Sequence, residues 1–222
     1  MPQCSNTIVV GARSSPLSIA QLEEVKRELK RFHPEISFVP FLVKTTGDHD
    51  KKSSLRMIGK TDFFTKEIDA LLLEGKCRIA IHAAKDLPEP LPQGIACVAW
   101  TQGVDPSDVL IMRPGVTFET LPQGSCIATS SLRREENVRA LRSDLTFVDI
   151  RGTIGERLAK LDSGEVDGVV MAEAALIRLG LTDRNRVQIP GGVAPLQGRL
   201  AILARSDDSE MKTLFHPLDY GL

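Results

Sequence analysis

The first half of the chain alternates short apolar runs with amphipathic segments. The run at 7–12 is apolar and β-prone, and Ser15 and Pro16 behind it suit a helix cap and a first helical position. Apolar residues then recur every three or four positions from Ile19 to Phe32, which predicts a helix ending near residue 33. The remaining predictions for this half are strands at 36–44, 78–83 and 95–100, a helix from Phe64 to a stop at Gly75, and a polar loop at 45–60.

The second half repeats this alternation. Thr153 and Glu156 have the spacing of a capping box, and Gly164 and Gly180 have the positions of helix ends. The predicted strands are 109–113, 125–129, 145–150, 168–172 and 199–205, and the predicted helices are 132–142, 153–164, 173–179 and 207–215. Strands separated by helices indicate βαβ units, so we predict an α/β fold.

The loops at 101–107 and 191–197 mark the expected crossings between two lobes. We expect one domain at 1–101 plus 198–222 and a second at 102–197, so that the chain crosses between the lobes twice. Each lobe is predicted to be a mixed, mostly parallel sheet flanked by helices, like that of a periplasmic binding protein.

Polar residues gather where the predicted strands end and the helices begin. In such sheets, ligands bind beyond the carboxyl ends of the strands and beside helix N-termini. The residues at these positions are Arg13, Ser15, Lys85, Asp86, Thr129, Ser130, Ser131, Arg133, Arg134, Arg151, Thr153 and Arg157, and Arg178 lies near the end of a later helix.

Arginines in a first helical turn oppose the positive end of the helix dipole, and an anionic ligand would remove this conflict. One surface arginine is also explained as a solvated charge, and one serine before a helix as a cap. The repetition at three strand ends favours a site for several carboxylates or phosphates. Asp86 is the one acid that we place immediately beside these strand ends. Its two interpretations are a turn residue and a buried anion that steadies a cationic group of the substrate.

Composition narrows the class of protein. The 28 Lys and Arg and 29 Asp and Glu residues give a formal charge of −1, which argues against binding to nucleic acid. The sequence has no run of the roughly 18 apolar residues that a membrane span requires and no signal-peptide pattern at its start. Cys4, Cys77, Cys97 and Cys126 lack disulfide or metal-site spacing. We therefore expect a cytoplasmic monomer with reduced thiols, no metal, and no nucleic-acid or membrane partner.

Six stretches of the sequence carry a resemblance to a known family. They are RSSPLSIAQ (13–21), FTKEIDALLLEGKCRIAIHAAKDLP (64–88), ATSSLRR (128–134), IRGTIGERLAKLDSGEVDG (150–168), ALIRLGL (175–181) and LQGRLAI (196–202). In this order and spacing they resemble the porphobilinogen deaminase (hydroxymethylbilane synthase) family, and the resemblance spans nearly the whole chain.

The resemblance implies a transferase of haem and tetrapyrrole biosynthesis. The family joins four porphobilinogen molecules with loss of ammonia, starting from a dipyrromethane cofactor that a cysteine holds through a thioether. Asp86 would be the catalytic carboxylate, which stabilises the positive charge formed as ammonia leaves. The residues that would grip the acetate and propionate arms are Arg13, Ser15, Lys85, Thr129, Ser130, Ser131, Arg133, Arg134, Arg151, Arg157, Arg178 and Gln197.

One departure from the family bears on the cofactor. The family continues after a position equivalent to Phe215 into a third domain that carries the cofactor cysteine, and these 222 residues contain no counterpart of it. Cys77, Cys97 and Cys126 fall in or beside apolar strands and are expected to be structural. The alternative function is therefore a two-lobed protein that binds polycarboxylates or other anions, or a degenerate deaminase that binds pyrrole acids without turnover.

Overall fold

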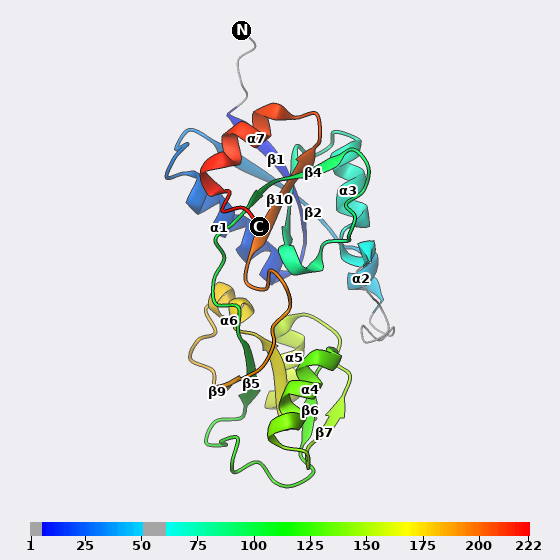
Figure 1. The fold of residues 1–222 in the computed structure, drawn as a ribbon, viewed down its shortest axis with the longest axis vertical. Coiled ribbons are helices and arrows are strands. Elements are labelled where there is room, and N and C mark those ends of the chain that lie inside the picture. The colour runs from blue at the N-terminus through cyan, green and yellow to red at the C-terminus, as the bar shows by residue number, and fades with distance from the viewer. Residues whose placement is uncertain (1–5, 51–60) are drawn as a thin grey trace. The chain divides into compact units, whose positions relative to one another are not determined.

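The computed structural model describes residues 6–50 and 61–222, which form two compact units. Among these residues, the first unit contains 6–49, 61–103 and 199–222, and the second contains 50 and 104–198 (Figure 1). No helix in the described ranges is long and apolar enough to cross a membrane.

The described part of the first unit is built on a five-stranded sheet in the order β2-β1-β3-β10-β4. Its strands are β1 (Thr7–Arg13), β2 (Ser37–Val43), β3 (Ile79–Ala83), β4 (Ile95–Trp100) and β10 (Leu200–Arg205). β1 is parallel to β2 and β3, whereas β10 lies between β3 and β4 and is antiparallel to both. A strand from near the end of the chain therefore lies inside a sheet formed by its beginning.

Helices cover the two faces of this sheet. They are α1 (Pro16–Leu29), α2 (Thr46–His49), α3 (Lys66–Leu73) and α7 (Ser209–Phe215), with 3₁₀ turns η1 (Asp62–Phe64), η2 (Ala84–Asp86) and η3 (His216–Leu218). Leu22 of α1 and Phe215 of α7 belong to one core cluster with Val10 of β1. Gly11 faces the other way, and a Cβ atom there would lie 3.0 Å from Ile68 of α3. The glycine therefore lets α3 approach β1 closely.

The second unit repeats this architecture within its described residues, with strand order β7-β6-β8-β5-β9. Its strands are β5 (Asp108–Met112), β6 (Cys126–Ala128), β7 (Thr146–Val148), β8 (Gly168–Ala172) and β9 (Arg186–Ile189). β6 is parallel to β7 and β8, whereas β5 is antiparallel to β8 and β9. β5, the first strand of the segment 104–198, is thus antiparallel to both neighbours, as β10 is in the first unit.

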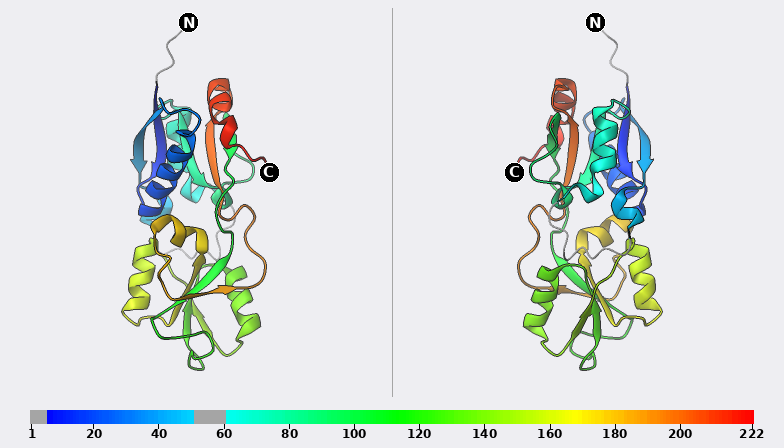
Figure 2. Two further views of the ribbon diagram at one scale, coloured as in Figure 1. Left: turned by 90° about the vertical axis from the view of Figure 1, so that its left-hand side faces the viewer. Right: turned by 90° about the vertical axis from the view of Figure 1, so that its right-hand side faces the viewer.

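Helices α4 (Leu132–Leu141) and α5 (Ile154–Asp162) lie on opposite faces of the second sheet (Figure 2). Val138 of α4 packs in one core cluster with Leu110 of β5. Leu161 of α5 packs in another with Ile111 of β5, where α6 (Glu173–Leu179) adds Leu176. The alternation of Leu110 and Ile111 therefore gives the sheet two buried faces.

The structure confirms the α/β class and most predicted elements, including β4, β8 and α6 at the predicted bounds. It also corrects four expectations. Each sheet has two parallel and two antiparallel pairs, so parallel pairing does not predominate. The first helix ends at Leu29, and β9 was not predicted because it has no apolar run. Part of the predicted loop at 45–60 is α2, whereas 51–60 lies outside the described residues.

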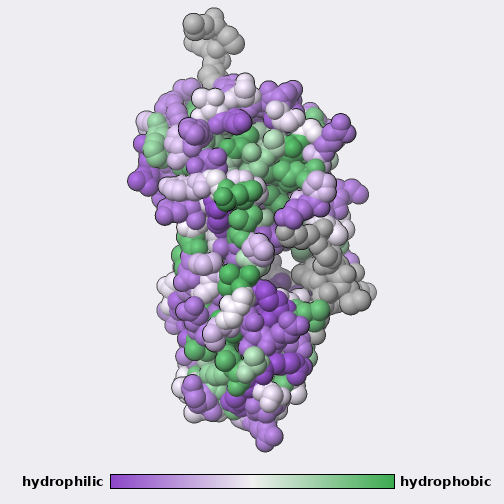
Figure 3. All heavy atoms as spheres, viewed as in Figure 1, coloured by the Kyte–Doolittle hydropathy of each residue, from purple (hydrophilic) through white to green (hydrophobic). Residues whose placement is uncertain are grey.

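Apolar residues gather on the face of the first unit that carries the edge strand β4 (Figure 3). The C-terminal segment lies against the last residue of this strand. Trp100 donates its backbone N–H to the carboxylate of Asp219 (2.9 Å), and Tyr220 donates to the backbone carbonyl of Trp100 (2.9 Å). These bonds occupy edge groups that β10 leaves unpaired.

Candidate active site

In the first unit, the end of β1 and the start of α1 bring Arg13 and Ser15 together. Ser15 caps α1 by accepting a hydrogen bond from the backbone N–H of Ser18 (3.2 Å). The guanidinium of Arg13 forms an ion pair with Asp48, in which Nε lies 3.3 Å from Oδ2, and it stacks 4.5 Å from the ring centre of Phe64. Arg13 is therefore held in place within its own unit.

Asp48 belongs to α2 rather than to the solvated loop that the sequence predicted. Its Oδ2 accepts hydrogen bonds from the backbone N–H (2.9 Å) and hydroxyl (3.0 Å) of Thr45. Burial would raise the pKa of Asp48, but the hydrogen bonds from Arg13 and Thr45 together lower it below its usual value. The carboxylate is therefore a stable anion and a permanent partner of Arg13.

Lys85 and Asp86 follow β3 in the 3₁₀ turn η2. The backbone of this turn is fixed, because Ala84 donates to the carbonyl of Arg199 (3.0 Å) and Leu87 donates to that of Ala84 (3.4 Å). Asp86 is exposed, so the expectation that it is a buried anion is wrong for this structure. The physical reason is its place at the end of the turn η2, which lies outside the sheet.

In the second unit, Thr129, Ser130 and Ser131 connect β6 to α4. Ser131 caps α4 by accepting from the backbone N–H of Arg134 (3.5 Å), and its own N–H donates to the Thr129 hydroxyl (3.2 Å). Ser130 Oγ accepts from the backbone N–H of Ile150 (3.2 Å) and donates to the carbonyl of the same residue. The Ser130 hydroxyl thus joins the β6–α4 connection to the segment that follows β7, whereas the hydroxyls of Thr129 and Ser131 bond within the connection and the first turn of α4.

Arg133 and Arg134 meet at a carboxylate that the sequence analysis missed. Asp108 is 1% exposed, and its pKa is lowered. Burial would raise this pKa, but the charge of Arg134 and the hydrogen bonds from Arg134, Arg133 and Gln197 more than offset that effect. Asp86 is therefore not the one acid at these strand ends. Asp108 begins β5, and because β5 is antiparallel to β8, it pairs with Ala172, the last residue of β8. In the sequence, the one available signal was an aspartate directly before the apolar run 109–112.

Arg151, Arg157 and Arg178 each bind a backbone carbonyl within the second unit. Arg151 Nη2 donates to Asp50 (2.6 Å), Arg157 Nε donates to Gly152 (2.9 Å), and Arg178 Nη2 donates to Gly198 (2.7 Å). These bonds do not join the three arginines to the Asp108 cluster. They hold Arg157 within its own helix start, and they tie Arg151 and Arg178 to other segments of the same unit.

Among the described cysteines, Cys77 is buried, and Cys97 and Cys126 are half-buried. Burial raises the pKa of the Cys77 thiol to about 11 and that of Cys97 to about 12, and it also raises the pKa of Cys126. Because the thiolate is the reactive form, these three side chains are poor nucleophiles. Cys4 lies outside the described residues.

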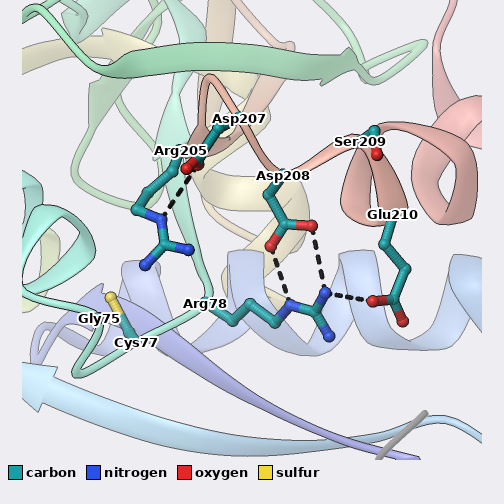
Figure 4. A pocket seen from close by; sticks show the side chains of 8 residues that line it. All are labelled: Gly75, Cys77, Arg78, Arg205, Asp207, Asp208, Ser209 and Glu210. Atoms are coloured by element: carbon teal, nitrogen blue, oxygen red, sulfur yellow. Dashed lines mark hydrogen bonds and ion pairs between the residues drawn. The ribbon is translucent and has the colours of Figure 1, made fainter. Parts of the chain in front are cut away.

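A polar cavity of about 560 Å³ lies beside the start of β3 and the end of β10 in the first unit (Figure 4). Arg78 binds Asp208 with both Nε (2.9 Å) and Nη2 (3.1 Å) and also pairs with Glu210, while Arg205 Nε lies 3.3 Å from Asp207. None of the predicted site residues lines this cavity. Its charges are paired with one another, so it is a structural link between the start of β3 and α7.

The fold places the chain in a class of two-unit α/β proteins that includes solute-binding proteins. The methionine-binding protein MetQ matches with a TM-score of 0.60 at 12% identity, covering 96% of this chain and 89% of MetQ. A probable amino-acid ABC transporter extracellular-binding protein from Bacillus subtilis matches with a TM-score of 0.54 at 14% identity, covering 96% and 89% of the two chains.

The family described as "Porphobilinogen deaminase, dipyromethane cofactor binding domain" matches residues 8–213. Porphobilinogen deaminase of Desulforudis audaxviator is 42% identical over 96% of this chain and 70% of its own length. Those of Chlorobium phaeobacteroides and Nostoc sp. are 39% and 38% identical over 96% of the chain, and the matches cover 69% and 68% of their lengths. The chain belongs to the porphobilinogen deaminase family.

Proposed function

We propose that this protein is a porphobilinogen deaminase, a transferase that joins four porphobilinogen units with loss of ammonia. The observation that carries the proposal is the family match over residues 8–213, which contains every predicted site residue. The geometry adds physical support, because hydroxyl and guanidinium groups lie at helix N-termini in both units. Such donors suit the acetate and propionate groups of a pyrrole.

The side chains of the dipyrromethane cofactor fit this donor set. It is a polycarboxylate, and the hydroxyls of Ser130 and Ser131 with the guanidinium groups of Arg133, Arg134 and Arg151 would hold its carboxylates. When bound, the cofactor supplies the acceptor to which porphobilinogen units are added. The thiols of the described cysteines, whose pKa values are raised, do not fit the thioether, since attachment needs a reactive thiolate.

We assign the charge-stabilising role to Asp86. Its carboxylate projects from a turn whose backbone is fixed at both ends, so little reorganisation is needed when a substrate arrives. It would accept hydrogen bonds from pyrrole N–H groups and oppose the positive charge that develops on porphobilinogen as ammonia leaves. Lys85 beside it would pair with a carboxylate arm, as would Arg13, whose orientation Asp48 fixes.

We further propose that the protein acts in the cytoplasm as a monomer, on porphobilinogen and pyrrole polycarboxylates, without nucleic-acid or membrane partners. The formal charge of −1 supports the exclusion of nucleic acid, because binding there depends on neutralising phosphates with basic residues.

The test is to incubate the purified protein with porphobilinogen. We expect release of ammonia and formation of a linear tetrapyrrole, followed as uroporphyrin after cyclisation and oxidation, while the intact mass reports any bound pyrrole chain. Tight binding of porphobilinogen without ammonia release would favour the alternative of a polycarboxylate-binding protein. If the protein shows no binding and no turnover of porphobilinogen, both functions are refuted.

A further inference from the structure

Asp108 is a buried carboxylate surrounded by the donors of three proposed binding residues. Its Oδ1 accepts from Arg134 Nε (2.8 Å) and Gln197 Nε2 (2.8 Å) and lies 2.7 Å from Arg134 Nη2, and its Oδ2 accepts from Arg133 Nη1 (2.6 Å). An unpaired carboxylate at this depth would be very unfavourable, so the donors and the acid depend on one another.

These contacts use some of the N–H donors of each guanidinium and leave the others without a partner among the described residues. Arg133 Nη1 also donates to the Gly192 carbonyl (2.5 Å), whereas its Nε and Nη2 have no partner among the described residues. Arg134 uses Nε and Nη2, and its Nη1 has no partner in the same ranges. Because a guanidinium is a rigid planar fork, fixing one edge also fixes the direction of the remaining donors.

We propose that Asp108 is a positioning residue, which orients Arg133, Arg134 and Gln197 for a substrate carboxylate before the substrate arrives. The inference rests on the proposed function, since it takes these three residues as part of the pyrrole-carboxylate site. The two possible effects of Asp108 on an anion have opposite signs. As a negative charge it would weaken anion binding, whereas as a positioning group it would strengthen binding by reducing the disorder lost when the anion is bound.

The first experiment compares Asp108→Asn with the wild-type full chain in steady-state turnover of porphobilinogen. We expect the KM to rise about tenfold with a much smaller change in kcat, because the lost orientation affects carboxylate binding. Asp167→Asn is the matched control: Asp167 also pairs with an arginine of the second unit, Arg113 (3.0 Å), but touches no proposed binding residue, and its KM should be unchanged. An unchanged or lower KM for Asp108→Asn would overturn the proposal.

The second experiment needs neither the variant nor turnover. In ligand-free wild-type protein, NMR should detect Arg134 Nε–H as an immobilised group that exchanges slowly with water, unlike that of the exposed Arg31. Equal exchange for the two arginines would refute positioning even if Asp108→Asn did not fold. Failure of the proposed function has a different signature: the wild-type chain does not convert porphobilinogen, while Arg134 remains immobilised.

Discussion

At the scale of single residues, three of the six predicted site arginines are already held by acids of their own unit. Arg13 pairs with Asp48, and Arg133 and Arg134 share Asp108. Each pair reduces the local positive charge, but it also fixes a long flexible side chain. Asp86 has no such partner among the described residues and is exposed, so its carboxylate is available to a substrate.

We predict that Asp86→Asn will lower kcat for porphobilinogen by about 10²–10³-fold, the usual effect of removing one electrostatic group that stabilises developing charge. Binding of simple dicarboxylates should be unchanged or tighter, because the variant removes a negative charge from a site for anions. Steady-state kinetics and calorimetric titration measure the two effects. Glu89→Gln, an exposed acid three residues away, is the control and should retain turnover. Weaker dicarboxylate binding in Asp86→Asn would contradict the assigned role.

A second prediction concerns the buried pair Asp69 and His82, whose Oδ1 and Nε2 atoms are 4.0 Å apart. Burial raises the pKa of Asp69 to about 6 and lowers that of His82 to about 4. The folded state therefore binds more protons than the unfolded state at Asp69, and fewer at His82, between about pH 4 and 6. The raised pKa of Asp69 makes the protein less stable as the pH rises, whereas the lowered pKa of His82 makes it less stable as the pH falls. The two effects on the free energy of unfolding therefore largely cancel.

Removing one member of the pair should reveal the effect of the other on the pH dependence of stability. We expect Asp69→Asn to lose stability more steeply than wild type on acidification from pH 6.5 to 4, by up to about 3 kcal/mol over the window. Urea unfolding at a series of pH values measures this difference. Asp207→Asn, whose side chain in the wild type is 78% exposed, should follow the wild-type curve. Parallel curves for Asp69→Asn and wild type would show that the burial of Asp69 has no energetic consequence.

At the scale of elements, local sequence determined most helices and strands. The helix ends were predicted from residues that act through hydrogen bonds or backbone angles within one turn, so their effects can be read without knowledge of the fold. These residues are Ser15 and Pro16 at the start of α1, Thr153 and Glu156 at the start of α5, and Gly180 at the end of α6. The sequence analysis did not predict α2, because its first backbone N–H group, that of Thr46, bonds a residue distant in the sequence, Glu67 of α3 (2.8 Å).

The candidate site was predictable only in part, for a related reason. Residues directly after parallel strands were found, because their place follows from the order of elements. Asp108 was missed because its position depends on the direction of β5. A strand that is antiparallel to β8 brings its first residue, rather than its last, to the edge where β8 ends. Strand direction is a tertiary property that the apolar run 109–112 does not encode.

The capping box of α5 provides a test at this scale. Thr153 Oγ1 accepts from the Glu156 backbone N–H (3.3 Å), and Glu156 Oε2 accepts from the Thr153 backbone N–H (2.7 Å). We predict that Thr153→Ala will lower the free energy of unfolding by about 1 kcal/mol, whereas Thr153→Ser, which keeps the hydroxyl, will lose much less. Denaturant unfolding measures both. Equal losses in the two variants would mean that the hydroxyl does not carry the effect.

At the scale of the whole molecule, the two units differ in continuity. Apart from residue 50, the described part of the second unit is the single segment 104–198, with a buried cluster on each face of its sheet. The first unit needs 199–222, because β10 joins β3 to β4 and because Met211 and Phe215 complete its core.

Ending the chain at Gly198 should therefore unfold one unit and spare the other. We expect hydrogen exchange of this shortened chain to show loss of protection in β1, β3 and β4, and retained protection in β5, β6 and β8. The full chain, measured under the same conditions, is the control and should protect both sets of strands. Protection of β3 and β4 in the shortened chain would show that the first sheet forms without β10.

The central place of β10 also has a consequence for synthesis on the ribosome. Domains usually fold as they emerge, the N-terminal one first. Here β4 meets its partner strand only after residue 205 has left the exit tunnel, by which time the whole of 104–198 has been translated. The second unit can thus fold before the first, whose sheet stays incomplete until residues 200–205 have been synthesised.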